Sequence, residues 1–165
     1  MSKKAAKIGI FVALAMIFSY IEVLIPFSFG IPGVKLGIAN IVVVTALYLM
    51  TPGEAFMISM VRIFLMGILF GNGVSLLYSF AGGILSFVVM YFFRKRNWFS
   101  VIGVSVLGGV FHNLGQILSA AFVIRSEKIL YYFPVLLLAG VITGALIGFL
   151  SEKIVKAMKI QSQTT

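Results

Sequence analysis

Long apolar stretches recur along this chain, and few charged residues interrupt them. Hydrophobic residues make up 61% of the sequence and charged residues 10%, whereas a soluble domain has roughly 45–50% apolar and about 25% charged residues. A helix needs about 20 mainly apolar residues to cross a bilayer. A chain of 165 residues therefore holds at most about six such helices, and no soluble domain of any size fits beside them. The sequence predicts an all-α membrane protein.

Proline, glycine and clusters of basic residues divide the apolar sequence into six segments. Pro26, the Thr51-Pro52-Gly53 turn, the Gly71-Asn72-Gly73 turn and the Arg94-Lys95-Arg96 cluster each end one of them, as helix-breaking and turn residues do. The predicted six-transmembrane-helix bundle has helices at about residues 8–25, 37–50, 54–70, 74–93, 99–124 and 129–150. We expect a single integral membrane domain over residues 1–157 and a polar C-terminal tail over residues 158–165.

The distribution of Lys and Arg predicts the orientation of this bundle. Six spans place nine of these residues on the side of the termini, namely Lys3, Lys4, Lys7, Arg94, Lys95, Arg96, Lys153, Lys156 and Lys159. The other side receives three, Lys35, Arg125 and Lys128. Because cytoplasmic loops carry the excess of basic residues, we expect both termini in the cytoplasm and the chain in the cell membrane. This distribution also explains the net charge of +9 without a nucleic-acid partner.

Arg62 lies midway along the third apolar segment, in the sequence ISMVRIFLM. An arginine at the centre of a bilayer costs about 2.5–3.5 kcal/mol on insertion scales, so it faces the bundle interior and finds a partner. Two interpretations stay open. The side chain is either a structural group paired within the bundle or an anion-binding group in a substrate cavity.

His112, Asn113 and Gln116 place three hydrogen-bonding side chains in one turn of the fifth segment, FHNLGQ. His112 and Gln116 share a helix face because they are four residues apart. Such side chains either bond to neighbouring helices or line a polar pocket. A metal site is not expected, since a lone histidine without aspartate or cysteine is a poor ligand set.

Lys35 and Asn40 lie in the connection IPGVKLGIAN between the first two segments. The predicted orientation puts this connection at the outer surface, where it can close over a cavity. Positive charges outnumber negative ones at this depth, which suits an anionic ligand arriving from outside. A lysine at the level of the lipid headgroups is the alternative.

Ala5, Gly9 and Ala13 repeat every four residues on the first segment. Small residues at this spacing let two helices approach closely. They indicate either packing within the chain or docking onto another membrane subunit.

Enzymatic activity is not expected of this chain. It has no aspartate, and therefore no Asp-rich cluster to hold the magnesium ions of a diphosphate substrate. No phosphate-binding loop of the form Gly-x-x-x-x-Gly-Lys-Ser/Thr and no Ser/His/acid set is visible, and cysteine is absent. The sequence indicates neither a cofactor nor a metal.

The motifs IPGVKLGIANIV, TPGEA, GVSVLGGVFHNLGQ and YYFPVLLLAGVITGALIG resemble a known family over nearly the whole chain. This is the family labelled heptaprenyl diphosphate synthase component I, also called the Gx transporter family. It is similar in turn to the substrate-binding S components of energy-coupling factor (ECF) transporters, which have six helices and a P-x-x-K-L-G-like start of the second.

The resemblance implies an S-component-like fold and a role in transport. S components bind a vitamin or related micronutrient from outside and dock through small residues of the first helix onto a transmembrane T component, which couples to two cytoplasmic ATPases. Ala5, Gly9 and Ala13 are then the expected docking face. Lys35, Asn40, Arg62, His112, Asn113 and Gln116 are the expected substrate-binding residues.

Two other functions remain open. The family label suggests a non-catalytic membrane subunit that assists polyprenyl diphosphate synthesis. A self-contained facilitator would need a continuous polar path, for which the inner halves of the helices offer few polar side chains.

Overall fold

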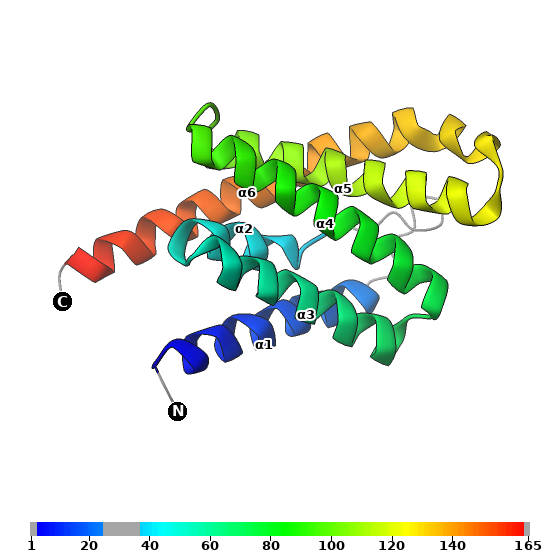
Figure 1. The fold of residues 1–165 in the computed structure, drawn as a ribbon. Coiled ribbons are helices and arrows are strands. Elements are labelled where there is room, and N and C mark those ends of the chain that lie inside the picture. Colours follow the sequence, from blue (N-terminus) through cyan, green and yellow to red (C-terminus); the bar gives the residue numbers. More distant parts are fainter. Residues whose placement is uncertain (1–2, 25–36, 164–165) are drawn as a thin grey trace.

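A computed structural model describes residues 3–24 and 37–163 of the chain, and it confirms the all-helical prediction. Within these residues, six α-helices and one 3-10 helix follow one another (Figure 1). Their bounds are α1 Lys3–Leu24, α2 Asn40–Leu49, α3 Pro52–Phe70, α4 Gly73–Arg96, α5 Val101–Ile124, η1 Glu127–Tyr132 and α6 Phe133–Gln163.

Each helix packs against particular neighbours. α5 contacts both α4 and α6 along its length, and α3 contacts α1 and α4. α2 lies among α1, α3 and α6, and its residues 41–47 are all buried. The first residues of α1 and the last of α6 lie at the same end of the bundle, at the left of Figure 1. The 3-10 turn between α5 and α6 lies at the opposite end.

In the described part of the chain, five of the six predicted spans are long and apolar enough to cross a membrane. α2 has 10 residues, and at 1.5 Å per residue it covers only about half of a hydrocarbon core of about 30 Å. The prediction of six full spans is therefore not confirmed, because α2 is too short to be one of them. Its burial on all sides makes it an interior element of the bundle.

α6 differs most from its predicted bounds of residues 129–150. The first residues of that range form the separate 3-10 helix η1, and α6 continues to Gln163. No glycine or proline interrupts the chain after Gly148, so nothing local ends the helix at the membrane surface. The predicted polar tail of residues 158–165 thus begins as helix through residue 163.

Glycines bring α5 and α6 into close contact. A Cβ atom built on Gly109 would lie 2.5 Å from the carbonyl oxygen of Gly140, and one built on Gly144 would lie 2.7 Å from the Cα of Val106. Only hydrogen atoms fit at these two crossings. The glycine-rich sequences of α5 and α6 therefore act as close helix contacts, which small residues typically form in membranes.

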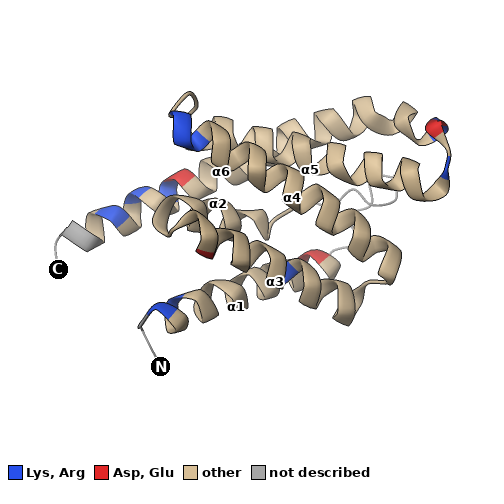
Figure 2. Cartoon of the chain, in the orientation of Figure 1, with Lys and Arg blue, Asp and Glu red and all other residues tan. Residues whose placement is uncertain are grey.

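Most of the charged residues gather at the two ends of the bundle, whereas a few blue and red segments lie between the ends (Figure 2). The ends of α1, α4 and α6 that carry the basic clusters lie together at the left of the view, and the α5–η1 turn with Arg125 and Lys128 lies at the right. The end of the bundle that holds the start of α1 and the end of α6 is called the basic end below.

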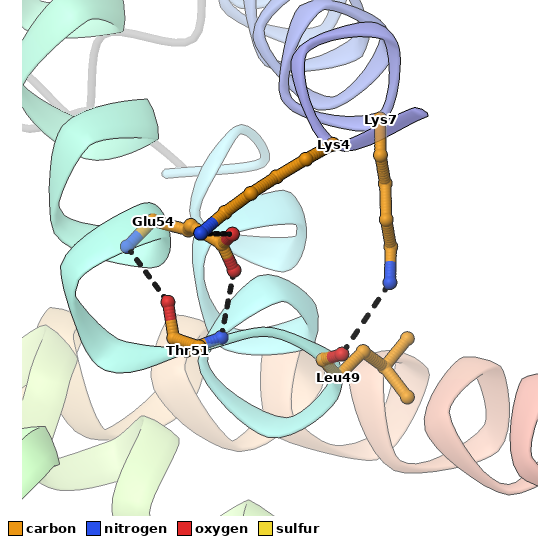
Figure 3. Close-up of polar contacts among 5 residues, drawn as sticks. All are labelled: Lys4, Lys7, Leu49, Thr51 and Glu54. Carbon is orange, nitrogen blue, oxygen red and sulfur yellow. Dashed lines mark hydrogen bonds and ion pairs between the residues drawn. The ribbon is translucent and has the colours of Figure 1, made fainter. Parts of the chain in front are cut away.

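At the basic end, two lysines tie the start of α1 to the turn between α2 and α3 (Figure 3). Lys4 Nζ lies 3.0 Å from Glu54 Oε1, and Lys7 Nζ donates to the carbonyl oxygen of Leu49 over 3.5 Å. Glu54 also accepts from the backbone N–H of Thr51 at 2.9 Å, and Thr51 Oγ1 accepts from the backbone N–H of Glu54 at 3.4 Å. This reciprocal capping box explains why α3 starts directly after Thr51.

Replacing Thr51 by valine is expected to lower the free energy of unfolding by about 1 kcal/mol, the usual cost of losing a helix N-cap. Thr45→Val is the matched control, because the buried Thr45 Oγ1 has no hydrogen-bond partner among the described residues. Removing an unpaired buried hydroxyl without changing side-chain shape is close to neutral. Thermal unfolding of both variants in detergent measures the difference. An equal or larger loss in Thr45→Val would contradict this explanation.

Candidate functional site

A cavity of about 110 Å³ lies inside the bundle, and five of the six predicted binding residues line it. They are Asn40 at the start of α2, Arg62 of α3, and His112, Asn113 and Gln116 of α5. The sixth, Lys35, lies outside the described residues. Residues far apart in the sequence thus meet at one place.

The cavity extends from the middle of the bundle toward the end opposite the basic end. Arg62 is midway along α3, whereas Phe70, Gly71 and Ser75, which also line the cavity, belong to the α3–α4 connection. That connection lies at the right of Figure 1, away from the two ends of the chain.

Arg62 is the cation among the described residues that line this cavity. Its side chain is 9% exposed, and its Nη2 donates to Asn40 Oδ1 at 3.3 Å. The carboxylate of Glu22 on α1 lines the same cavity and attracts the guanidinium electrostatically. Arg62 Nε is buried and has no hydrogen-bond partner among the described residues. Because a buried charged donor without a partner is costly, Arg62 is a candidate ligand-binding residue.

Glu22 joins the last turns of α1 to the start of α2. It accepts a hydrogen bond from the backbone N–H of Gly37, whose φ of +69° favours glycine. Gly37 in turn accepts from the backbone N–H of Asn40 at 2.8 Å. The carboxylate thereby positions the residue that binds Arg62.

α5 supplies the opposite polar wall. Asn113 Nδ2 donates to the carbonyl oxygen of Leu136 on α6 at 2.7 Å, so this residue both lines the cavity and bonds a neighbouring helix. His112 and Gln116 line the cavity one helical turn apart. Thr143 of α6 also lines it, but its hydroxyl donates to the carbonyl oxygen of Ala139 in its own helix at 2.8 Å.

Glu22 and Ser19 were not among the predicted binding residues. Ser19 is 6% exposed and lines the cavity, and its Oγ has no hydrogen-bond partner among the described residues. A glutamate near the C-terminal end of the first apolar segment is a signal that sequence reasoning could have used, since ionisable residues within membrane helices are usually functional. A lone serine gives no such signal.

The small residues of α1 lie on two different faces. Ala15 and Ser19 are buried in the bundle, whereas Ala5, Gly9 and Ala13 are exposed. A Cβ atom built on Gly9 would meet no described atom within 4 Å. The exposed face, defined by Ala5, Gly9 and Ala13, is therefore open to a neighbouring helix.

The family model described as heptaprenyl diphosphate synthase component I matches residues 11–154. The chain belongs to this family. The match covers α2 to α5 completely and most of α1 and α6, and with the five helices that can cross a membrane it identifies a multi-pass membrane protein of the family. No curated protein and no solved structure matches the chain significantly.

Proposed function

We propose that this chain is the membrane substrate-binding subunit of an ECF-type importer, and that it captures a small anionic micronutrient or precursor from outside the cell. The observation that carries the proposal is that Arg62 and Ser19 line one cavity, and that each has a buried donor without a hydrogen-bond partner among the described residues. A bundle that served packing alone would satisfy or replace such groups.

The orientation of the chain in the membrane is part of this proposal. The basic end carries most of the Lys and Arg residues, and basic residues are retained in the cytoplasm. The cavity extends toward the other end, so it receives solute from outside. Lys35 is proposed to help close it.

Single cysteines test this orientation, because the chain contains no natural cysteine. Lys128 is exposed at the α5–η1 turn, and Ser100 is exposed just before α5. We expect a membrane-impermeant maleimide to label Lys128→Cys in intact cells, and Ser100→Cys only after permeabilisation. The reverse pattern would place the cavity toward the cytoplasm and contradict the proposed direction of capture.

Docking onto an energising module is proposed for the exposed face of α1. Ala5, Gly9 and Ala13 give this face a shallow surface on which a helix of a T component can pack closely. The two ATPases would then couple to the T component on the cytoplasmic side, near the basic end. In this arrangement the chain itself needs no nucleotide-binding motif.

A second candidate function follows from the description of the family, which names a component of heptaprenyl diphosphate synthase. The chain would then be a non-catalytic membrane subunit that assists a soluble, Asp-rich prenyl transferase. In both functions the chain is not itself the enzyme.

Affinity purification of the tagged chain from its host, in mild detergent, separates the two functions. The importer predicts co-purification of a membrane T component and ATPase subunits. Recovery of a soluble prenyl transferase, with synthase activity that requires this chain, would favour the second function and overturn the first.

A further inference from the structure

Three consecutive cations end α4 at the basic end (Figure 2), and no described carboxylate neutralises them. Arg94, Lys95 and Arg96 form the last turn of the helix, and none of them makes an ion pair within the described part of the chain. Glu54 and Glu152, the glutamates nearest this end, are each paired with another lysine. The cluster therefore keeps its positive charge and can attract an anion from outside the bundle.

Two aromatic rings hold the guanidinium of Arg96 in place. Its Cζ lies 5.2 Å from the centroid of the Phe92 ring and 5.6 Å from that of Trp98, and these two rings pack edge to face at 87°. Phe93 supports Trp98, with ring centroids 5.8 Å apart, and itself packs against the buried core. Stacking covers the faces of a guanidinium and leaves its in-plane N–H donors open. The Arg96 side chain donates no hydrogen bond to a described residue, so its donors are fixed but unused by the described chain.

An exposed apolar row leads along α4 to this guanidinium. Ile84, Val88 and Phe92 are 45%, 55% and 44% exposed, and residues four apart are neighbours on the surface of a helix. Arg96 is the next member of the row. At 1.5 Å per residue, the helix rises about 18 Å from Ile84 to Arg96, slightly more than half of a hydrocarbon core of about 30 Å. With Arg96 at the level of the headgroups, the row spans one leaflet of the membrane.

We infer that the surface formed by Ile84, Val88, Phe92 and Arg96, called the α4 lipid face below, binds an anionic phospholipid of the leaflet at the basic end. The lipid phosphate accepts hydrogen bonds from the planar fork of Arg96, which matches phosphate geometry. The acyl chain lies along the apolar row. A zwitterionic lipid brings its own cation and leaves the cluster uncompensated, whereas an anionic lipid neutralises part of it, as basic clusters at the ends of membrane helices do.

This site goes beyond the retention of basic residues in the cytoplasm. Retention depends on positive charge and needs no particular geometry, whereas the α4 lipid face combines a guanidinium held by two rings with an apolar row of leaflet length. The site requires only that the basic end lie at a membrane surface. It does not depend on the proposed transport function, because it uses no residue of the cavity.

Trp98 reports on this face directly, since it is the single tryptophan of the chain and stacks on Arg96. The purified protein is reconstituted in two sets of phosphatidylcholine vesicles that contain the same small fraction of lipid brominated near the headgroup. The brominated lipid is phosphatidylglycerol in one set and phosphatidylcholine in the other, and bromine quenches tryptophan fluorescence on contact. From the quenching curves we expect the wild type to prefer phosphatidylglycerol by at least about fivefold.

Three variants that keep Trp98 separate a defined site from general charge. Arg96→Gln should lower the preference to below about twofold, because it removes both the charge and the charge-assisted hydrogen bonds. Arg96→Lys keeps the charge but loses the planar fork, so it should lose most of the preference too. Lys159→Gln removes an exposed cation from α6 at the same end and should keep the preference of the wild type.

Equal quenching of the wild type by the two brominated lipids would overturn the inference. The same loss in Lys159→Gln as in Arg96→Gln, or the full preference in Arg96→Lys, would reduce the effect to general charge and overturn the defined site. If Arg96→Gln kept the lipid preference but lost co-purifying subunits, the face would bind a protein instead. The quenching results leave the proposed importer untouched, since none of the variants changes the cavity.

Discussion

Replacing Gly144 by leucine is expected to prevent the chain from reaching its folded state. A Cβ at this position would lie 2.7 Å from the Cα of Val106 and 2.9 Å from the carbonyl oxygen of Ser105. These are backbone atoms of α5, so α5 and α6 can accommodate a side chain only by moving apart. Overpacking against movable side chains costs about 1–3 kcal/mol, and a clash with backbone costs more. We expect loss of the monodisperse peak in size-exclusion chromatography, or a fall in thermal stability larger than that of any other variant proposed for this chain.

Gly9→Leu is the matched control, since it makes the same change on another membrane helix. A Cβ at Gly9 meets no described atom within 4 Å, and leucine has a higher helix propensity than glycine by about 0.8–1.0 kcal/mol. This variant should fold at least as well as the wild type. If both variants were equally stable, the close α5–α6 packing described above would be wrong.

The same Gly9→Leu variant is expected to lose the partner subunits while it keeps its fold and its ligand. The exposed face of Ala5, Gly9 and Ala13 is shallow because its side chains are small. A leucine at its centre would hold a docking helix away from the backbone of α1. An overpacking cost of about 1–3 kcal/mol corresponds to a loss of affinity of about 10- to 100-fold. Quantitative mass spectrometry of proteins that co-purify with the tagged variant measures this loss.

Val88→Leu provides the control for docking. Val88 is 55% exposed on α4, so the substitution enlarges an apolar side chain that faces lipid on another helix. Co-purification should be unchanged in this variant. If Gly9→Leu retained its partners at the level of the wild type, the docking face would not be the one formed by Ala5, Gly9 and Ala13.

Local signals in the sequence predicted most of the helices. The Thr51-Pro52-Gly53 and Gly71-Asn72-Gly73 turns mark the boundaries of α3 because Thr51 and Asn72 cap the helices that follow. The bounds of α2 and α6 could not be obtained in this way. α2 is short because it is enclosed by α1, α3 and α6, which is a tertiary effect. α6 extends past residue 150 because no glycine or proline follows Gly148 to end it.

The polar residues of the site were predictable as inward-facing groups, but their mutual arrangement was not. Arg62 and His112 stand out in apolar segments, since burying their polar atoms in lipid is costly. The pairing of Arg62 with Asn40 joins residues 22 positions apart, and the attraction to Glu22 spans 40 positions, so both depend on how α1, α2 and α3 pack. The unpartnered Ser19 hydroxyl likewise becomes meaningful only when the cavity beside it is known.

The most direct test of the central claim is to ask whether the purified protein carries a solute around Arg62. Small molecules would be extracted from wild-type and Arg62→Gln proteins, purified in parallel from the same host, and quantified by mass spectrometry. We predict an anionic solute in near-stoichiometric amount with the wild type and about tenfold less, or none, with Arg62→Gln. Finding no solute in the wild type, or the same amount in both proteins, would contradict the role assigned to this cavity.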